Sequence, residues 1–506
     1  MKSLLKKKAG WFLIAFIIKL FIFIIHTGAF HSNWPEGSIT KGIWVNTNDT
    51  KDYYQPIERL LNGEGYSLKT TDDEGVSAVR PWAFRMPGLL PIYAPLNLIL
   101  GGEWAKFFII ILQFFLEVIC VLLLAQCARW IFNNKTIAAF CFIFYLFSIY
   151  VSIHTNFAAS ESFCTSFFIV SFYFFIRYIQ HKNKKRLFVS GFFLCWSIFF
   201  RPTIMFMAIA YPIILLILDK KNGTFSIGSF FQKSFILFSF FIFFDAIWIV
   251  RNYKAFDRFV PLNDSFSAVA SAQEIALYNL IIAWGEDIQD WNPSAGRWFV
   301  RPTNSTTRVY DSTFQKTNPF PPSVFTQDYN LDSLKSLRQI YWKTFAKTEN
   351  DSSAYYYRTI FVQKSTAYLQ SYKSNKPFQY YVLNKFKFFK RFLFIKVPYG
   401  TPFTGKNIFN KAIRGLQLLL YYFIILSAIA GVFLVWKRKL LLPKLVSLLA
   451  ILFIFIHVWF GYVENRYLVP LYPILVLFSA YFFYSVIEKR QFFKRITNKI
   501  DNFIIE

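Results

Sequence analysis

The chain is poor in charged residues and in cysteine for its length of 506 residues. Charged side chains make up 17%, against about 25% in soluble domains, while hydrophobic residues reach 55%. The five cysteines lie within or at the ends of apolar segments without Cys-x-x-Cys spacing, so neither a disulfide framework nor a thiolate metal site is indicated. The five histidines are scattered, without HxxxH or HExxH spacing. These absences argue against a soluble multi-domain enzyme.

Nucleotide-binding signals are also missing. Neither GxGxxG nor GxxxxGK[ST] occurs, so a nucleotide sugar or ATP is not indicated as a substrate. The chain carries 56 Lys and Arg against 28 Asp and Glu, but the basic residues do not cluster on a soluble segment. We therefore expect no nucleic-acid partner.

Ten apolar segments approach the length of about 20 residues that a helix needs to cross a bilayer core. They lie near 11–29, 105–131, 136–154, 157–178, 187–200, 203–218, 232–251, 413–436, 441–460 and 466–487. The first segment lacks an A-x-A-like cleavage site, so we expect it to be a retained anchor. The sequence thus predicts an all-α polytopic membrane protein with about ten transmembrane helices.

Basic residues occupy every second connection between these segments, as well as both ends of the chain. By the positive-inside rule, both termini are expected in the cytoplasm and the protein in the plasma (inner) membrane. The opposite connections then include two long outer-face loops, about 30–104 and 252–412. The first should carry two short helices, Tyr53–Leu61 and an interfacial one at Pro87–Leu100.

Three regions follow from this division of the chain. Residues 1–251 form an N-terminal transmembrane module with the first outer loop at 30–104. Residues 252–412 form a large outer-face loop or small soluble domain, in which Trp284 and Trp291 are candidates for stacking on a sugar or for structural packing. Residues 413–506 form the C-terminal transmembrane helices and a basic cytoplasmic tail.

Two acidic positions stand out on the predicted outer face. Asp49 precedes the first short helix, where it either caps the helix or, partly buried beside apolar helices, serves as a general base. Glu161 opens an otherwise apolar helix; a carboxylate there either pairs with the helix dipole or belongs to a functional site.

Four arginines lie at the same predicted face, where positive charge is disfavoured: Arg85, Arg201, Arg251 and Arg466. Each can reach lipid headgroups or pair with a carboxylate. As a set, they suit a phosphate-headed lipid, because guanidinium groups bind phosphate oxygens bidentately.

These residues fall into four motifs that resemble those of GT-C-fold glycosyltransferases using polyprenyl-phosphate sugars, in particular protein-mannosyltransferase-like and lipid A aminoarabinose-transferase-like proteins. The motifs are Asp49 and Tyr53 with Gly63, Gly65, Tyr66, Arg85, Pro87 and Gly88; Ser160-Glu161 with Arg201-Pro202-Thr203; Arg251-Asn252-Tyr253 with Phe256, Phe259 and Pro261; and Glu464, Arg466, Tyr467, Pro470 and Pro473. They extend over residues 11–262 and 413–487 and leave the loop 263–412 uncovered.

The resemblance implies a site in which Asp49 is the catalytic acid and Glu161 the second acidic position. Thr50 stands where many relatives have a second acid, so Asp52 supplies that charge or is itself the base. A divalent metal is compatible with the resemblance but not required. The substrate-binding candidates are Tyr53, Arg85, Arg201, Arg251, Glu464, Arg466 and Tyr467.

The predicted function is an inverting transfer of one sugar from a polyprenyl-phosphate carrier to a lipid, glycan or protein acceptor on the outer face, in cell-envelope glycan biosynthesis. The alternatives are a flippase or transporter of a lipid-linked glycan, and a glycan polymerase or ligase. A transporter would use polar groups deep within spans, for which Asp245, Gln113 and Glu117 are candidates. No internal repeat is visible, which weakens that alternative.

Overall fold

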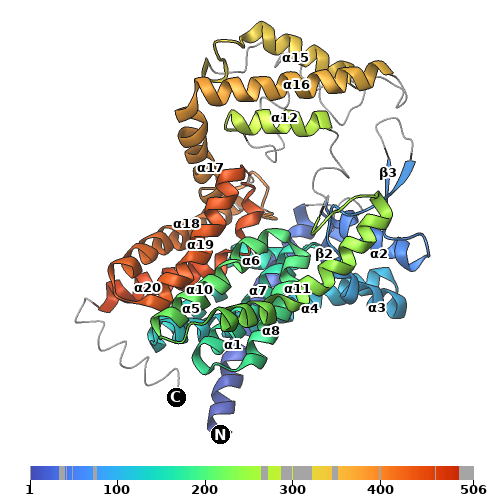
Figure 1. Ribbon diagram of the computed structural model, residues 1–506. Helices are drawn as coiled ribbons and strands as arrows, with labels where there is room; N and C mark the ends of the chain where they lie inside the picture. Colours follow the sequence, from blue (N-terminus) through green and yellow to red (C-terminus); the bar gives the residue numbers. More distant parts are fainter. Residues whose placement is uncertain are drawn as a thin grey trace.

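The computed structural model describes residues 2–33, 40–41, 43–47, 49–71, 77–263, 272–286, 299, 322–344, 352–397, 400–461 and 463–488. Most of these residues are helical (Figure 1). Trp291 and the basic tail from residue 489 onward lie outside the described residues.

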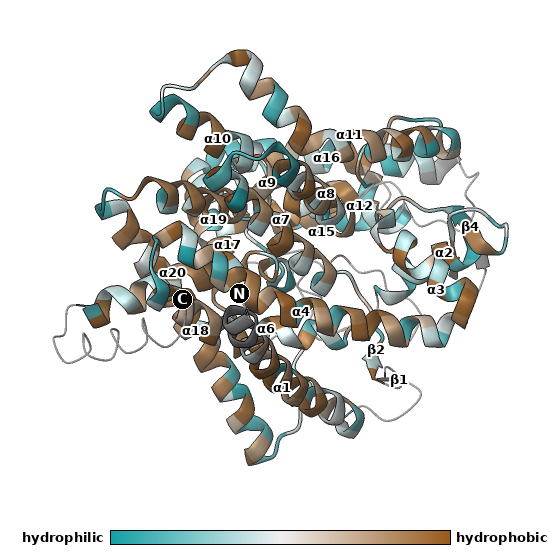
Figure 2. Cartoon of the chain, turned by 90° about the horizontal axis from the view of Figure 1, so that it is seen from below, coloured by the Kyte–Doolittle hydropathy of each residue, from teal (hydrophilic) through white to brown (hydrophobic). Residues whose placement is uncertain are grey.

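All ten predicted membrane segments are helical. They comprise α1 (Lys2–Asn33), α4 (Gly102–Phe132), α5 (Lys135–Leu146) with α6 (Ile149–Ser152) and η2 (Ile153–Asn156), α7 (Glu161–His181), α8 (Lys184–Phe200), η3 (Pro202–Ile204) with α9 (Met205–Ala208) and α10 (Ala210–Lys221), α11 (Ile227–Phe256), α18 (Ile408–Lys437), α19 (Leu441–Phe460), and η6 (Asn465–Leu468) with α20 (Tyr472–Glu488). Brown, hydrophobic residues dominate these helices in Figure 2. The predicted fold class, an all-α polytopic membrane protein, is confirmed.

Seven helices among the described residues are long and apolar enough to cross a membrane, or eight if the bent pair α5 and Ile149–Asn156 counts as one span. The predicted segments 187–200 and 466–487 form α-helices of 17 residues and are not in this count, so the number of about ten spans stays a prediction. The predicted span 466–487 begins as η6, and its α-helix starts only at Tyr472, since Pro470 lacks the amide hydrogen that a helix interior requires. At 17 residues, α8 and α20 are each only about 26 Å long.

Close helix packing depends on two glycines. A Cβ atom on Gly191 of α8 would overlap the carbonyl of Leu237 on α11, and one on Gly431 of α18 would overlap the carbonyl of Phe478 on α20. Both pairs of helices therefore approach backbone to backbone. The remaining interior is filled by a continuous cluster of buried aliphatic and aromatic side chains that joins the amino-terminal and carboxy-terminal spans.

The segment between α1 and α4 contains more structure than the two short helices predicted there. These helices are present as α2 (Thr50–Leu61) and as η1 (Pro87–Leu89) with α3 (Leu90–Leu100). Two antiparallel hairpins were not predicted: β1 (Thr40–Lys41) with β2 (Trp44–Val45), and β3 (Ser67–Thr71) with β4 (Ser77–Pro81). Trp44 and Leu68, buried on β2 and β3, anchor the hairpins to the helical core.

The described helices of residues 272–397 lie at one end of the bundle (Figure 1). They are α12 (Ala272–Ala283), η4 (Pro322–Val324), α15 (Leu331–Lys343) and α16 (Ser352–Asn375), followed by the π-helix η5 (Gln379–Leu383) and α17 (Asn384–Leu393). A separate aromatic core holds α12, α15 and α16 together. The division at residues 251 and 412 stays a prediction.

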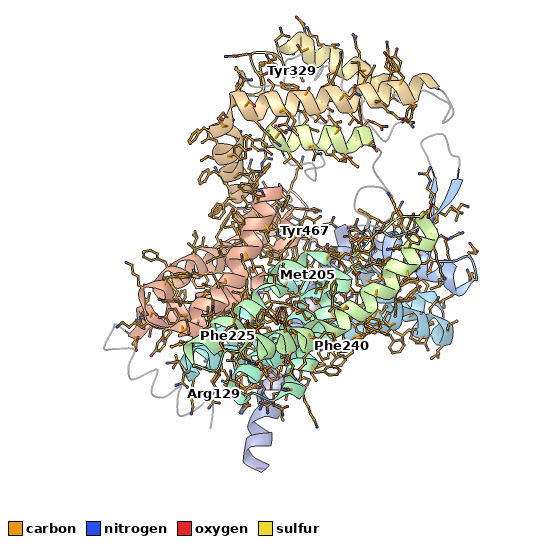
Figure 3. The ribbon with its side chains drawn as sticks, viewed as in Figure 1. Arg129, Met205, Phe225, Phe240, Tyr329 and Tyr467 are labelled. Atoms are coloured by element: carbon orange, nitrogen blue, oxygen red, sulfur yellow. The ribbon has the colours of Figure 1, made fainter. Side chains whose placement is uncertain are left out.

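Two labelled residues in Figure 3 mark opposite parts of the bundle. Arg129, from a predicted basic connection, lies toward the end where α1 begins. Tyr467 lies near the end that faces α12. Arg129 and Tyr467 are thus drawn apart in the fold.

Candidate active site

Asp49 occupies the N-cap position of α2, yet its side chain makes no capping hydrogen bond. Its Oδ1 lies 2.9 Å from Nη2 of Arg85, and its Oδ2 pairs with Nη1 of Arg466. The carboxylate therefore binds two guanidinium groups instead of the helix that it precedes.

Asp52 and Tyr53 lie on the first turn of α2, beside the same arginine. The Asp52 carboxylate is 3.9 Å from Nε of Arg85, a looser contact than that of Asp49. Arg85 also lies over the ring of Tyr53, 5.2 Å from its centroid, and the Tyr53 hydroxyl is 2.8 Å from Oγ of Ser160. The first turn of α2 thus joins Arg85 to the start of α7.

Glu161, at the start of α7, is buried together with Arg201, which follows α8. Nη2 of Arg201 donates to Oε1 of Glu161 at 2.5 Å, and its Nε donates to Oγ of Ser160 at 3.2 Å. Ser160 therefore bridges Arg201 and Tyr53. Ser160 belongs to the second sequence motif but was not a predicted site residue.

Arg466 connects the carboxy-terminal spans to this cluster. Besides Asp49, it contacts Glu464 at 2.8 Å and Glu161 at 3.9 Å. The guanidinium groups of Arg201 and Arg466 lie 5.2 Å and 5.9 Å from the centre of the Tyr467 ring. Nine of the ten predicted site residues therefore form one connected group, which we call the charged cluster: Asp49, Asp52, Tyr53, Arg85, Glu161, Arg201, Glu464, Arg466 and Tyr467.

The two aspartates of α2 differ in acidity. Burial tends to raise the pKa of Asp49, but the guanidinium groups of Arg85 and Arg466 outweigh it and hold that pKa below its usual value. For Asp52, burial dominates over the attraction of Arg85, and the negative charge of Asp49 adds to it, which raises the pKa to about 6. Burial likewise raises the pKa of Glu464, although Arg466 opposes it.

Arg251 is the predicted site residue that lies apart from the charged cluster. On α11, it donates to the carbonyls of Tyr66 and Trp82, the latter at 2.8 Å. It also lies over the rings of Tyr66 and Trp248. Arg251 therefore ties the segment carrying Arg85 to a spanning helix and does not itself contact an acidic residue of the cluster.

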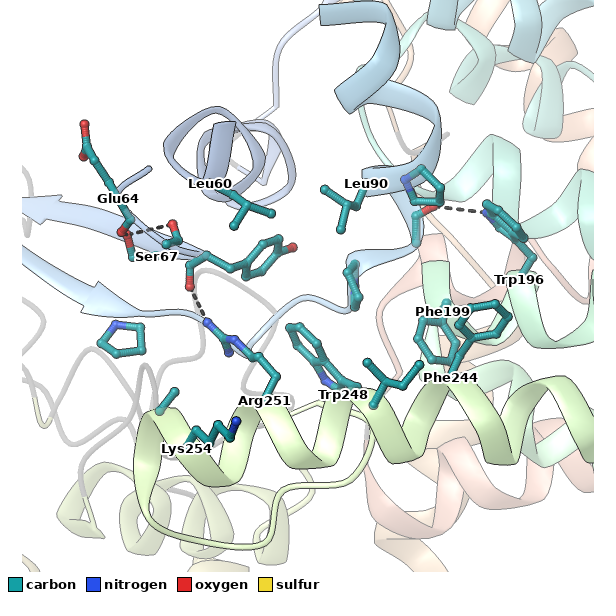
Figure 4. Close-up of a pocket in the computed structure, with 18 of the residues that line it drawn as sticks. Leu60, Glu64, Ser67, Leu90, Trp196, Phe199, Phe244, Trp248, Arg251 and Lys254 are labelled. Carbon is teal, nitrogen blue, oxygen red and sulfur yellow. Dashed lines mark hydrogen bonds between the residues drawn. The ribbon is translucent and has the colours of Figure 1, made fainter. Parts of the chain in front are cut away.

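A cavity of about 760 Å³ lies beside Arg251, between α2, η1, α8 and α11 (Figure 4). Its walls are mainly apolar, with Leu90, Trp196, Phe199, Phe244 and Trp248 among them. Arg251 and Lys254 lie together on α11 at one side, and Phe199 and Phe244 lie away from them in Figure 4. Glu64 also lines the cavity on the side of Arg251, so the cavity has a charged part and an apolar part. Lys254 was not a predicted site residue, because it resembles any other Lys at a helix end.

The charged cluster and the cavity share the segment that leads into η1. Arg85 belongs to the cluster, while Pro87 and Gly88 line the cavity. The Gly88 carbonyl accepts a hydrogen bond from Trp196 Nε1 at 3.1 Å. A Cβ atom at Gly88 would overlap the backbone of Phe199, so this segment rests directly on α8.

The donor set does not fit a resident metal ion. Asp49, Asp52, Glu161 and Glu464 each face a guanidinium group. Within the ranges that the structure describes, no group of three or more His, Cys, Asp and Glu side chains is arranged to hold a metal ion.

Trp284, one of the two tryptophans considered for sugar stacking, is only 4% exposed. It packs against Tyr368 and Phe299 in the core around α12 and α16. Its role here is structural packing.

Residues 92–248 match the family of dolichyl-phosphate-mannose-protein mannosyltransferases. This range contains Glu161 and Arg201, whereas Asp49 and Arg466 lie outside it. The chain has no significant match among curated protein sequences.

Several solved structures are similar at low identity. The oligosaccharyltransferase of Archaeoglobus fulgidus in complex with Zn and sulfate has 13% identity and a TM-score of 0.41 over 97% of this chain and 51% of that one. The chain thus spans about half the length of that protein. ArnT from Cupriavidus metallidurans bound to undecaprenyl phosphate has 11% identity and a TM-score of 0.35, over 93% of this chain and 77% of that one.

The family match depends on sequence and not on these structural scores. It includes the second of the four motifs and reaches into the spanning helices on both sides of it. Over residues 92–248, the chain carries the pattern of the dolichyl-phosphate-mannose-protein mannosyltransferase family, which confirms the resemblance to polyprenyl-phosphate-dependent membrane glycosyltransferases that the motifs indicate.

Proposed function

We propose that the chain transfers a sugar from a polyprenyl-phosphate carrier to an acceptor hydroxyl on the outer face of the plasma membrane, with both termini in the cytoplasm. The observation that carries this proposal is the charged cluster. Asp49, Arg85, Glu161, Arg201 and Arg466 come from four separate parts of the chain and meet in one network of ion pairs. Together with Asp52, which lies beside Arg85, this set combines a proton acceptor with cations for a leaving phosphate.

The proton acceptor of this reaction must have a free lone pair and a pKa near the working pH. Both oxygens of Asp49 pair with guanidinium groups. Asp52 has one distant contact with Arg85 and a pKa of about 6, raised by burial. We therefore assign the base to Asp52, and to Asp49 the orientation of Arg85 and Arg466, whereas the family resemblance points to Asp49 as the catalytic acid.

The transfer is a single displacement. Asp52 takes the proton of the acceptor hydroxyl, and the acceptor oxygen attacks the anomeric carbon of the sugar. The bond between that carbon and the carrier phosphate oxygen breaks, and the electron pair leaves with the phosphate. The guanidinium groups of Arg85, Arg201 and Arg466 stabilise the charge that develops on the phosphate. Attack from the side opposite the phosphate inverts the configuration of the sugar.

The cavity suits the isoprenoid part of the carrier. Its apolar walls favour hydrocarbon chains, and it adjoins the segment that carries Arg85. Arg251 and Lys254 add positive charge at one side, close to where an amphiphilic lipid would pass from the bilayer to the cluster.

The three polar residues named for the transporter alternative all have partners within the fold. Asp245 accepts a hydrogen bond from the amide of Leu262 at 3.0 Å, and Gln113 donates to the carbonyl of Phe157 at 3.2 Å. Glu117 pairs with Lys19 at 2.7 Å. Each of these groups has a structural partner within the fold.

The direct test uses the full chain in proteoliposomes with a panel of polyprenyl-phosphate sugars, and mass analysis of glycolipids and glycoproteins from cells with and without the protein. We expect an acceptor that gains one sugar and an equal amount of released polyprenyl phosphate. Lipid translocation without transfer would support the flippase instead. Addition of many sugars in one product would support a polymerase or ligase.

A further inference from the structure

A buried ion pair lies inside the spanning helices, outside the charged cluster. Lys19 of α1 is 1% exposed and Glu117 of α4 is 3% exposed, with 2.7 Å between Nζ and Oε1. Charges within a membrane are costly unless they are paired and fully hydrogen-bonded. The proposed transfer uses neither residue, so the pair needs its own explanation.

The hydrogen bonds of this pair all reach one broken span. Lys19 donates to the carbonyl of Tyr145 at 3.1 Å and to Oγ of Ser152 at 2.8 Å. Glu117 accepts from Oγ of Ser152 at 2.7 Å and from Oγ1 of Thr155 at 2.6 Å. Tyr145 lies in the last turn of α5, whereas Ser152 and Thr155 follow the 45° bend. At the break, the Tyr145 carbonyl accepts from the Ser148 amide at 3.2 Å as well as from Lys19. Polar groups at a helix break inside a bilayer need such partners within the protein.

The broken span is connected to two acidic residues of the charged cluster, Asp49 and Glu161. After η2, the amide of Ala158 donates to the carbonyl of Val45 at 3.1 Å, and Phe157 forms a parallel bridge with Val45. Val45 precedes Asp49 by only four residues, and Ala158 precedes Glu161 by three. The position of the segment 156–160 therefore sets both carboxylates at once.

We propose that Lys19 and Glu117 are positioning residues for the charged cluster. Their ion pair fixes the path of the chain after the broken span. Because this segment is bridged to Val45, the same ion pair also fixes the positions of Asp49 and Glu161. The kinetic part of this inference rests on the proposed transferase function. Its structural part does not.

The main test replaces both charges with apolar side chains of similar length, Lys19→Met with Glu117→Met, in the full chain in nanodiscs. Removal of both partners avoids the uncompensated charge that a single substitution leaves. We expect exchange of the Ala158 amide to accelerate about tenfold or more as the bridge opens. The value of kcat should fall about a hundredfold with little change in KM, because small displacements of catalytic groups are costly.

Two milder variants keep the proposal testable if that double variant does not fold. Lys19→Arg should preserve both exchange and kcat. Ser152→Ala with Thr155→Val keeps the ion pair but removes its hydrogen bonds to the part of the broken span beyond the bend, and should accelerate exchange of the Ala158 amide. The matched control is Asp219–Lys233, a 2.5 Å ion pair between α10 and α11, whose replacement by apolar residues should alter neither exchange at Ala158 nor kcat.

The proposal would be overturned if the Ala158 amide exchanged at the wild-type rate in the variants that lose the ion pair or its hydrogen bonds to Ser152 and Thr155. Faster exchange with unchanged kcat would also overturn it, since the pair would then be structural only. If the wild-type protein shows no sugar transfer at all, the proposed function fails, and exchange alone still decides whether the pair positions the segment.

Discussion

Arg466 and Asp49 are 417 residues apart in the sequence and form an ion pair in the folded chain. The same guanidinium group lies 3.9 Å from Glu161. The carboxy-terminal spans thus complete a site to which the amino-terminal third of the protein contributes Asp49, Asp52 and Glu161. Contacts between distant segments of this kind require that both groups of spans pack correctly before the site exists.

Single substitutions of Asp52 and of Asp49 by Asn distinguish the roles of the two carboxylates. We expect Asp52→Asn to lower kcat by about two to four orders of magnitude, the contribution typical of a general base. Asp49→Asn should raise the donor KM as well, because Arg85 and Arg466 lose their shared partner. Steady-state kinetics in proteoliposomes measure both effects. Glu103→Gln, at an exposed position of α4, serves as the matched control, and normal rates for both aspartate variants would contradict the site.

The rate should depend on pH through Asp52. Burial raises its pKa to about 6, so at lower pH the carboxyl is protonated and cannot accept a proton. We expect kcat/KM to rise about tenfold per pH unit below this value and to level off above it. The Asp49 charge also raises the pKa of Asp52, so Asp49→Asn should move the inflection to lower pH. An unchanged inflection in that variant would argue against Asp52 as the titrating group.

The pair Arg201 and Glu161 should be important for stability as well as for transfer. Arg201→Met leaves the buried Glu161 carboxylate without its nearest cation and should cost about 3–5 kcal/mol of unfolding free energy. The double variant Arg201→Met with Glu161→Met should recover most of that stability but no activity. Thermal unfolding in detergent, followed by transfer assays, tests both statements. A fully active double variant would show that Arg201 and Glu161 are not needed for transfer.

The geometry of Arg466 should matter beyond its charge. A lysine cannot contact Asp49, Glu161 and Glu464 together, because its ammonium group lacks the planar fork of guanidinium. Arg466→Lys should therefore reduce kcat/KM by about tenfold or more. Arg438→Lys, at a position with a 43% exposed side chain, is the control. Equal kcat/KM for the two variants would contradict this role.

The cavity can be tested with neighbouring residues of one helix. Phe244 lines the cavity, whereas Phe243 is exposed and does not line it. We expect Phe244→Ala to raise the KM for long-chain carriers several-fold and to affect short-chain carriers less, because lost apolar contact weakens only a chain that fills the cavity. Phe243→Ala should leave both values unchanged. A uniform effect on carriers of every length would argue against the cavity as the isoprenoid site.

Most of the charged cluster could be predicted from the sequence because its members break a local rule. Arg85, Arg201 and Arg466 lie next to apolar helices at the end predicted to be the outer face, where positive charge is disfavoured, and Glu161 opens an apolar span. Ser160 breaks no such rule, so its bridge between Tyr53 and Arg201 was visible only in the structure. Arg251 breaks the rule as well, yet its partners are backbone carbonyls, which no side-chain pattern reveals.

The sequence by itself determined the membrane class, the ten helical segments and the candidates for the site, because hydrophobic length and the placement of isolated charges are local properties of a chain. Only the tertiary structure decided which of those charges pair, that Asp49 binds two arginines instead of capping α2, and that Asp52 has the higher pKa. Ion pairing and burial depend on distances between segments far apart in the chain, and packing alone sets those distances.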